Sequence, residues 1–143
     1  MLFRSRLAAM REETGLENVM MIGQQSKDKM PMLWGLSNVS LVLLKKSDLF
    51  KLVIPSKIFE SMAMQKPIIL GVEGESREII EAADAGRCIE PESGKQLAEQ
   101  VMALYENAAL CAELGANGRK HVAEYFDRMV LARRYESLMQ ALV

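Results

Sequence analysis

The chain has 143 residues, of which 50% are hydrophobic and 26% are charged, a composition typical of a soluble protein with a single core. Its formal net charge of −1 excludes a general attraction to nucleic acid or to an anionic membrane. No apolar run approaches the roughly 20 residues that span a bilayer, and the start of the chain lacks the apolar block of a signal peptide. We therefore expect a cytoplasmic protein whose two cysteines, Cys88 and Cys111, are unpaired.

The first third of the chain predicts a helix, a strand, a weaker helix and a second strand. Gly15 can take the left-handed conformation that closes the first helix. Residues 18–23 are a short apolar run that ends in glycine, which predicts a buried strand. The weaker helix covers residues 26–39, and the second strand covers residues 40–47.

The middle of the chain continues this alternation. We expect a helix over residues 55–65 and a strand over residues 66–71. A further helix over residues 74–86 leads into a short strand over residues 87–91.

Three more helices are expected after residue 92. Ser93 and Gln96 can form a capping box at the start of the first. The second meets the glycines of residues 115–118, where we expect an interruption, and then resumes. The third begins at Asp127 as its N-cap. Its apolar stripe consists of Leu131, Tyr135, Leu138 and Leu142.

Strands that alternate with helices predict an α/β fold with a parallel sheet, because parallel strands need helical crossovers. The strands are apolar throughout, so helices should cover both faces and give a three-layer, Rossmann-like domain. Ligands of such sheets bind outside the carboxyl ends of the strands. These ends lie at Gly23, at residues 45–47 and at residues 71–74, where we expect a ligand.

One stretch, VIPSKIFESMAMQKPIILG, has the pattern of a nucleotide site. Pro55 fits the first turn of a helix, and Ser56, Lys57 and Glu60 then share one face. The free N–H groups of the first turn and the charge of Lys57 favour a phosphate. Glu60 lies one turn deeper, where its carboxylate can accept hydrogen bonds from two ribose hydroxyls. The alternative is an exposed ion pair between Lys57 and Glu60, which needs no ligand.

Three stretches resemble the C-terminal, nucleotide-binding half of family 4 glycosyltransferases of the GT-B fold. The central one is PSKIFESMAMQKPIILGVEGESREIIEAADAGRCIEPES. Before it comes GLENVMMIGQQSKDKMPMLWGLSNVSLVLL, which is similar to the preceding strand–helix–strand of that half. After it comes LGANGRKHVAEYFDRMVLARRYESLM, which is similar to the closing helices. The nearest resemblance is to the bacterial surface-polysaccharide branch, whose donors are often UDP-linked N-acetyl amino sugars.

The resemblance implies roles for residues of the central stretch. In the family motif Glu-x7-Glu, the second glutamate matches Glu60 and implies a contact with the ribose hydroxyls. The first falls at Leu52, which cannot bind a sugar hydroxyl, so a role for the first glutamate does not carry over. Lys57, beside Ser56, is expected to contact the diphosphate.

Two loops are implied as further parts of the donor site. The loop at Gly23 and Gln24 resembles the place where the family's backbone contacts the base. The loop GVEGES, which contains Gly74, resembles the glycine-bearing loop near the donor sugar, although both of its glycines could simply serve a turn. Enzymes of this fold generally need no bound metal, and we expect no cofactor.

The resemblance also implies that part of the parent protein is missing. The family's C-terminal half usually starts with a strand and a glycine turn, whereas this chain starts inside or just before the helix that follows them. The absent strand is expected to be central, between the strands of residues 18–23 and 66–71. We therefore expect residues 1–143 to be a partial, N-terminally truncated C-terminal domain without the N-terminal, acceptor-binding domain, and to be inactive alone.

The implied reaction of the parent enzyme is transfer of a sugar, with retention of configuration, from a nucleoside-diphosphate sugar, expected to be UDP-linked. The acceptor would be a surface glycan or a lipid-linked glycan, reached through the missing half at the inner face of the membrane. The alternative is a stand-alone α/β nucleotide-binding or receiver-like regulatory module that acts through protein contacts. A receiver needs clustered aspartates at strand ends, and Asp48 has no acidic pair after the strand of residues 18–23.

Overall fold

The computed structural model describes residues 2–142, with side chains from residue 5 onward. The chain forms two units, Met1–Met30 and Pro31–Val143. The first unit contains α1 (Leu2–Glu13) and the short 3-10 helix η1 (Lys27–Lys29). Gly15 has a φ of 63° and closes α1, as predicted.

Residues 18–23 do not form the predicted strand. The segment has no regular secondary structure, and the side chain of Met20 is 84% exposed. A strand is stable only where a neighbouring strand pairs with its N–H and C=O groups. The sheet that the described residues form does not include this segment. The apolar run predicted a strand, but the described residues provide no neighbouring strand with which this segment pairs.

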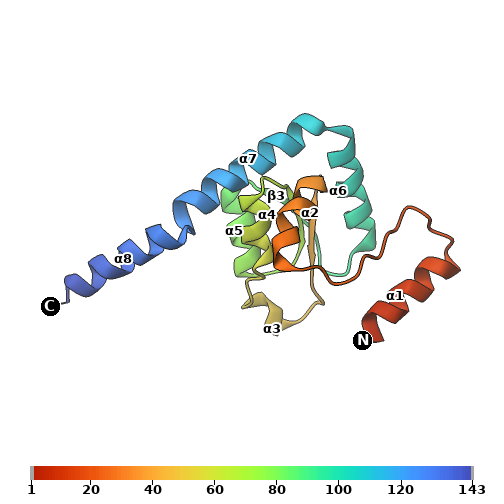
Figure 1. Cartoon of the computed structure of the whole chain (residues 1–143), viewed down its shortest axis with the longest axis horizontal. Coiled ribbons are helices and arrows are strands. Elements are labelled where there is room, and N and C mark those ends of the chain that lie inside the picture. The colour runs from red at the N-terminus through yellow and green to blue at the C-terminus, as the bar shows by residue number, and fades with distance from the viewer. Residues whose placement is uncertain (1, 143) are drawn as a thin grey trace. The chain divides into compact units, whose positions relative to one another are not determined.

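The second unit is a parallel α/β domain, which confirms the predicted fold class (Figure 1). Its three strands lie in the order β1-β2-β3, and both pairs are parallel. Ser40 pairs with Ile68, which in turn pairs with Gly86. The elements in chain order are α2 (Met30–Leu36), β1 (Ser40–Leu43), α3 (Asp48–Lys51), α4 (Lys57–Ala63), β2 (Ile68–Gly71), α5 (Glu75–Ala83), β3 (Gly86–Cys88), α6 (Gly94–Glu106), α7 (Ala108–Tyr125) and α8 (Arg128–Gln140).

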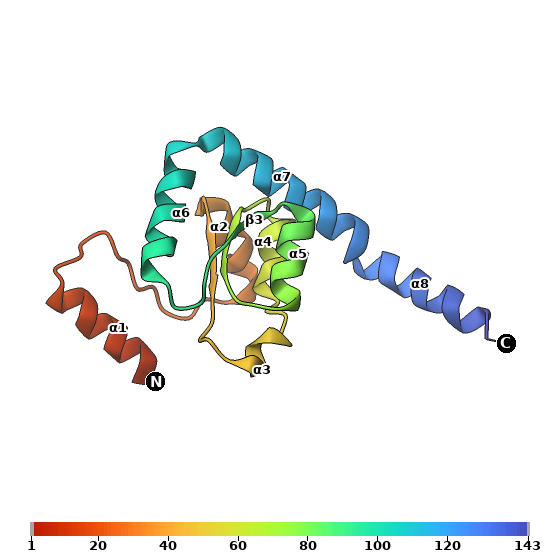
Figure 2. The same cartoon turned by 180° about the vertical axis from the view of Figure 1, so that it is seen from behind.

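Helices cover both faces of the central strand, so the domain has three layers (Figure 1 and Figure 2). Ile68 and Leu70 of β2 are buried in a cluster to which α4, α5 and α7 contribute. Ile69, on the opposite face, is buried with Leu104 of α6 and Leu114 of α7. The alternation explains why this strand is apolar at every position.

The sheet order corrects the expected position of an absent strand. β2 lies between β1 and β3, so a further strand cannot pair with residues 68–71. Among the described residues, the outer edge of β1 has no paired strand. Leu41 and Leu43 lie on this edge strand and are 47% and 45% exposed. Within residues 2–142 the edge strands are therefore β1 and β3, and the strand of residues 68–71 is the central one.

The glycines of residues 115–118 do not interrupt the helix, because α7 is continuous from Ala108 to Tyr125. They serve close packing instead. A Cβ added to Gly115 would lie 2.3 Å from the backbone oxygen of Gln65, and one added to Gly118 would lie 3.2 Å from the side chain of Met62. The glycines allow α7 to lie directly against the end of α4.

The predicted helix caps are largely confirmed. The Ser93 hydroxyl accepts a hydrogen bond from the Gln96 N–H at 3.3 Å, but the Gln96 side chain accepts from the N–H of Glu90. The capping box is therefore half formed. The Asp127 carboxylate accepts from the N–H of Met129 at 2.8 Å and begins α8 as predicted.

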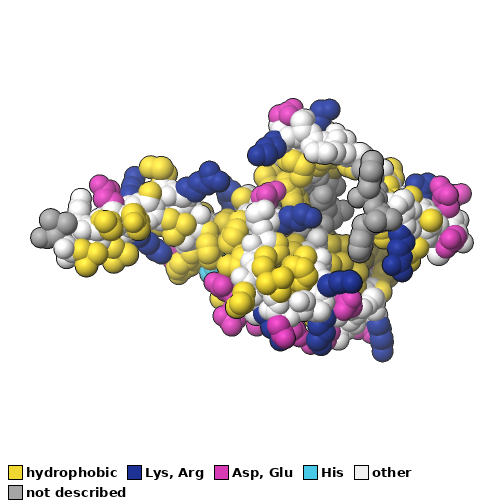
Figure 3. All heavy atoms as spheres, turned by 90° about the horizontal axis from the view of Figure 1, so that it is seen from below, with side chains coloured by type: hydrophobic (Ala, Val, Ile, Leu, Met, Phe, Trp, Pro, Cys, Tyr) yellow, Lys and Arg dark blue, Asp and Glu magenta, His cyan; other side chains and the backbone are white. Residues whose placement is uncertain are grey.

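α8 continues beyond α7 and has no buried residue. Its apolar stripe lies on the surface, and Figure 3 shows hydrophobic side chains gathered along this helix. No helix within residues 2–142 combines the length and the apolar composition needed to cross a membrane.

Candidate functional site

The start of α4 has the helical geometry that its sequence predicts. Ser56 is already helical, with φ −56° and ψ −25°, and the carbonyl of Pro55 accepts a hydrogen bond from the N–H of Ile58 at 3.0 Å. The first turn therefore begins at Pro55, where the missing N–H of proline costs no hydrogen bond. This turn lies at the carboxyl edge of the sheet, after β1 and α3.

The side chains of Ser56, Lys57 and Glu60 are all exposed, whereas Ile58 between them is buried. Among the described residues, no ion pair joins Lys57 to Glu60. The alternative of a simple exposed pair is therefore not what the geometry shows. Both charged groups remain free to meet a ligand.

The buried side of α4 is fixed to the sheet. The hydroxyl of Ser61 donates to the carbonyl of Lys57 at 2.6 Å and lies 2.8 Å from the hydroxyl of Ser40 on β1. The ring of Phe59 packs against Phe126 with centroids 4.7 Å apart. These contacts hold α4 in a defined position relative to β1 and to the end of α7.

A cavity of about 340 Å³ lies between the edge of β1 and the first turn of α4. Ser56 and Lys57 contribute to its wall, so two of the predicted binding residues face the same space. The full lining is Leu41, Val42, Leu43, Leu44, Pro55, Ser56 and Lys57.

Gly74 is required by backbone packing. Its φ is 79°, and a Cβ added there would lie 2.2 Å from the backbone oxygen of Lys51. The neighbouring Ser76 is buried and donates to the carbonyl of Val53 at 2.9 Å. The loop after β2 is thus held against the segment that leads into α4, and this packing alone accounts for the glycine.

The predicted base-contacting residues, Gly23 and Gln24, lie in the first unit. The side chain of Gln25 donates to the carbonyl of Gly23 at 3.1 Å and shapes this loop locally. Ser56, Lys57, Glu60 and Gly74 therefore all belong to the second unit, whereas the loop predicted to contact the base belongs to the first.

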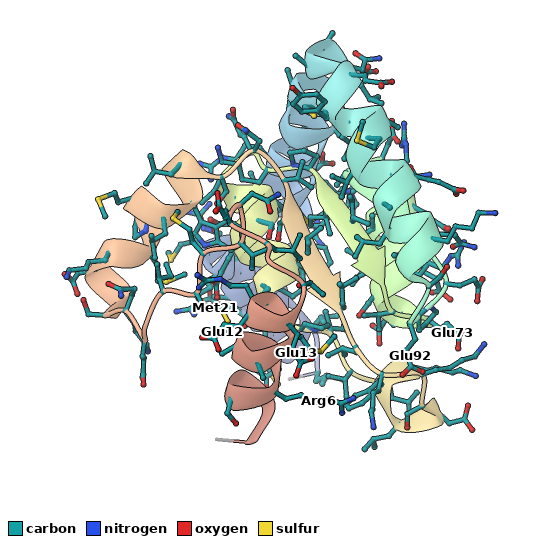
Figure 4. The ribbon with its side chains drawn as sticks, turned by 90° about the vertical axis from the view of Figure 1, so that its right-hand side faces the viewer. Arg6, Glu12, Glu13, Met21, Glu73 and Glu92 are labelled. Carbon is teal, nitrogen blue, oxygen red and sulfur yellow. The ribbon has the colours of Figure 1, made fainter. Side chains whose placement is uncertain are left out.

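A charged cluster at the same edge of the sheet was not singled out from the sequence. Glu73, in the loop after β2, lies 3.5 Å from Lys51 and 3.9 Å from Lys46. Glu92, after β3, accepts from the backbone N–H of Lys46 at 3.4 Å. Figure 4 shows Glu73 and Glu92 at the same end of the sheet. Their position after successive strands could have indicated this meeting, because carboxyl ends of parallel strands share one edge.

Two pKa shifts follow from local contacts. The pKa of Lys51 is raised, first by its hydrogen bond and charge interaction with Asp48 and then by the charge of Glu73. Burial raises the pKa of the Cys88 thiol to about 11. Both cysteines are free, as predicted. Within residues 2–142, no three His, Cys, Asp or Glu side chains are grouped to hold a metal ion.

Comparison with known families gives a match over most of the chain. Residues 3–121 match the family described as "Glycosyl transferases group 1". No curated protein sequence matches the chain with significance.

Solved structures of low sequence identity share the fold. Sucrose-phosphate synthase (tll1590) from Thermosynechococcus elongatus is 21% identical over 99% of this chain, with a TM-score of 0.77. Anabaena Alr3699/HepE in complex with UDP is 19% identical over 96% of this chain, with a TM-score of 0.83. The C-terminal domain of the glycosyl transferase group 1 family protein LpcC from Francisella tularensis is 21% identical over 90% of this chain, with a TM-score of 0.72. The chain spans 34%, 36% and 64% of these three proteins.

Proposed function

The chain belongs to the group 1 glycosyl transferases, and we propose that it binds the donor of a sugar transfer, a nucleoside-diphosphate sugar. The observation that best supports this proposal is the similarity to a protein with UDP bound, at a TM-score of 0.83 over 96% of this chain. UDP is accordingly the nucleotide that we propose for this chain. The family match favours this role over a receiver-like regulatory module.

The diphosphate would lie at the first turn of α4. Backbone N–H groups at a helix start and the positive end of its dipole attract an anion, and Lys57 adds a full charge beside them. Ser56 lines the adjoining cavity and can donate a hydrogen bond. Phosphate charge that develops as the sugar leaves would be stabilised by these fixed donors.

The ribose would lie one turn further along α4. Glu60 is exposed and free of an ion pair among the described residues, so its carboxylate can accept from two ribose hydroxyls. Gly23 and Gln24 would contact the base through their backbone, and the loop at Gly74 would lie near the sugar. A carboxylate at Glu60 suits a neutral diol, whereas it would repel a phosphate placed there.

The parent reaction that we propose is that of a family 4 enzyme of the surface-polysaccharide branch, with retention of configuration. The acceptor would be a glycan or lipid-linked glycan at the inner membrane face, bound by a second half outside these 143 residues. The chain spans about a third of sucrose-phosphate synthase and of HepE. Because transfer requires both substrates to be held together, we expect these 143 residues alone to bind donor without transferring sugar.

The test is calorimetric titration of UDP into the 143-residue chain and into its Glu60→Gln variant. Glutamine removes the charge and one acceptor, and we expect UDP affinity to fall at least tenfold, about 1.4 kcal/mol, with the melting temperature unchanged. Glu99→Gln is the matched control, because Glu99 forms an exposed pair with Lys95 at 3.9 Å on α6. A wild-type chain that binds no UDP would refute the proposed function, and equal affinity of wild type and Glu60→Gln would refute the ribose role.

A further inference from the structure

A cavity of about 600 Å³ lies at the amino edge of the sheet, opposite the edge of the proposed donor site. One wall comes from residues 37–39 and 65–67, which directly precede β1 and β2. The other wall comes from the second half of α6 and the start of α7. Figure 1 and Figure 4 show the connection between α6 and α7 at the end of the sheet away from α3. None of the residues proposed to bind the donor lines this cavity.

The floor of the cavity is apolar and continuous with the core. Pro67 and Leu104 are both buried. Leu104 belongs to the cluster that covers Ile69 of the sheet, and Val39 packs against that cluster. The thiol of Cys111 donates to the carbonyl of Leu104 at 3.2 Å and joins α7 to α6 beside the floor. An apolar group that entered the cavity would therefore leave water for a fixed apolar surface, which is favourable.

Lys66 is the only charged residue that lines the cavity. Its side chain is partly buried, and it forms no ion pair among the described residues. Its Nζ lies 3.4 Å from the carbonyl oxygen of Gly35, longer than the roughly 2.7–3.2 Å of a usual N–H···O hydrogen bond. An ammonium group without a carboxylate partner thus lies beside an apolar floor. This charge favours a ligand that is negative at one end and apolar at the other.

The neighbouring residue, Gln65, has a backbone conformation that favours glycine. Its φ is 54°, in the left-handed region. Gly115 of α7 packs against its carbonyl oxygen, because an added Cβ would lie 2.3 Å from that atom. Glycine would adopt this backbone without strain, whereas glutamine adds an exposed amide to the wall of the cavity. Residues held in such conformations cluster at ligand sites, and an amide can donate to an anionic oxygen.

We propose that this cavity binds a small amphipathic monocarboxylate, with its hydrocarbon body on the apolar floor and its carboxylate at Lys66 and Gln65. The volume lies within the roughly 300–1,000 Å³ of ligand pockets, which combine an apolar lining with a few polar groups. Tyr105 lines the cavity with its side chain 81% exposed, so its ring is available to cover part of the ligand. One lysine matches the single charge of a carboxylate better than the nearly double charge of a phosphate monoester.

The experiment is an NMR titration of the isotope-labelled 143-residue chain with two acids, octanoate and hydrocinnamate. Their neutral counterparts, octanol and hydrocinnamyl alcohol, are titrated in parallel, and acetate tests the need for an apolar body. We expect at least one acid to shift the amide signals of Cys111 and Ala112 saturably, with those of Lys57 and Glu60 constant, and acetate to shift neither pair. Lys66→Gln should weaken binding of that acid about fivefold, the upper value for a partly exposed ion pair, and binding of its alcohol less than twofold.

Two further variants complete the test. Ala112 lines the cavity and is exposed, so Ala112→Trp fills the space without displacing a core side chain and should abolish binding of acid and alcohol. Lys95→Gln is the matched control, because Lys95 pairs with Glu99 at 3.9 Å on the exposed surface of α6, and it should leave both affinities unchanged.

Three results would each overturn the inference. They are the absence of saturable shifts at Cys111 and Ala112 with both acids, equal effects of Lys66→Gln on acid and alcohol, and full binding of the acid by Ala112→Trp. Should Ala112→Trp not fold, as judged by circular dichroism, the comparison of acid and alcohol in Lys66→Gln decides alone. UDP binding is measured separately, so each of these results leaves the proposed function standing.

Discussion

Replacing Gly115 by alanine should destabilise the second unit by about 2 kcal/mol. The added Cβ would lie 2.3 Å from the backbone oxygen of Gln65, well inside the 3.0 Å below which real Cβ atoms are essentially never found. α7 and the end of α4 would have to separate, and the atom they meet is backbone, which cannot rotate away. Overpacking of this kind costs about 1–3 kcal/mol, and we expect a cost near the upper value because the clash is with backbone. Alanine has a better helix propensity than glycine, which offsets about 1 kcal/mol and leaves a net loss of about 2 kcal/mol.

Two further glycines give a graded comparison. At Gly118 the added Cβ would lie 3.2 Å from Cγ of Met62 and 3.2 Å from Cβ of Ala85, a tight contact that a shift of a few tenths of an ångström relieves, so Gly118→Ala should cost about 1 kcal/mol, less than Gly115→Ala. At Gly94, the first residue of α6, nothing lies within 4 Å, and Gly94→Ala should stay within about 0.5 kcal/mol of the wild type.

The assay is equilibrium unfolding in urea, followed by circular dichroism at 222 nm. With an m-value of about 1–3 kcal/mol/M, a loss of about 2 kcal/mol lowers the urea midpoint by roughly 1 M. The urea midpoint should be highest for Gly94→Ala, lower for Gly118→Ala and lowest for Gly115→Ala. Equal midpoints for Gly115→Ala and Gly94→Ala would show that α7 does not approach α4 as closely as described.

Two more predictions concern a lysine and a cysteine. Lys57→Ala should weaken UDP binding more than uridine binding in calorimetry, since only UDP carries the diphosphate; equal losses for both ligands would identify Lys57 as a solvated surface charge. Because burial raises the pKa of Cys88 to about 11, its neutral thiol contributes stability below its unfolded pKa, and this contribution is lost as the pH rises towards 11. The urea midpoint of the wild type should therefore fall more between pH 8.5 and pH 11 than that of Cys88→Ala, and parallel profiles would contradict the burial of this thiol.

The sequence pattern predicted a helix or strand correctly where the spacing of its own apolar residues reflects the face that it buries. The strands at residues 40–43 and 68–71 and the helix at residues 57–63 lie inside their predicted ranges, because their apolar spacing reflects the faces they bury. Residues 18–23 have an equally apolar pattern but form no strand. A sheet strand depends on its neighbour, and that information is not present in the segment itself.

The candidate site likewise contains residues that the sequence could place and residues that it could not. Ser56, Lys57 and Glu60 lie within one turn of each other, so helical spacing alone places them on one face. Glu73 lies 22 residues after Lys51 in the sequence, and the two meet because Gly74 packs on Lys51 and Ser76 donates a hydrogen bond to the carbonyl of Val53. Spacing along the chain cannot predict a meeting that depends on tertiary contacts.

The position of α7 has a consequence for the synthesis of the protein. Val122 of this helix completes the cluster on one face of the sheet, and Leu114 completes the cluster on the other. A chain grows from its N-terminus at about 5–20 residues per second, so the strands leave the ribosome before either cluster can close. During that interval the nascent chain exposes apolar surface that a chaperone could bind. A premature stop codon before Ala108 would leave both clusters permanently open, and we expect such a product to be degraded rather than to persist as a smaller domain.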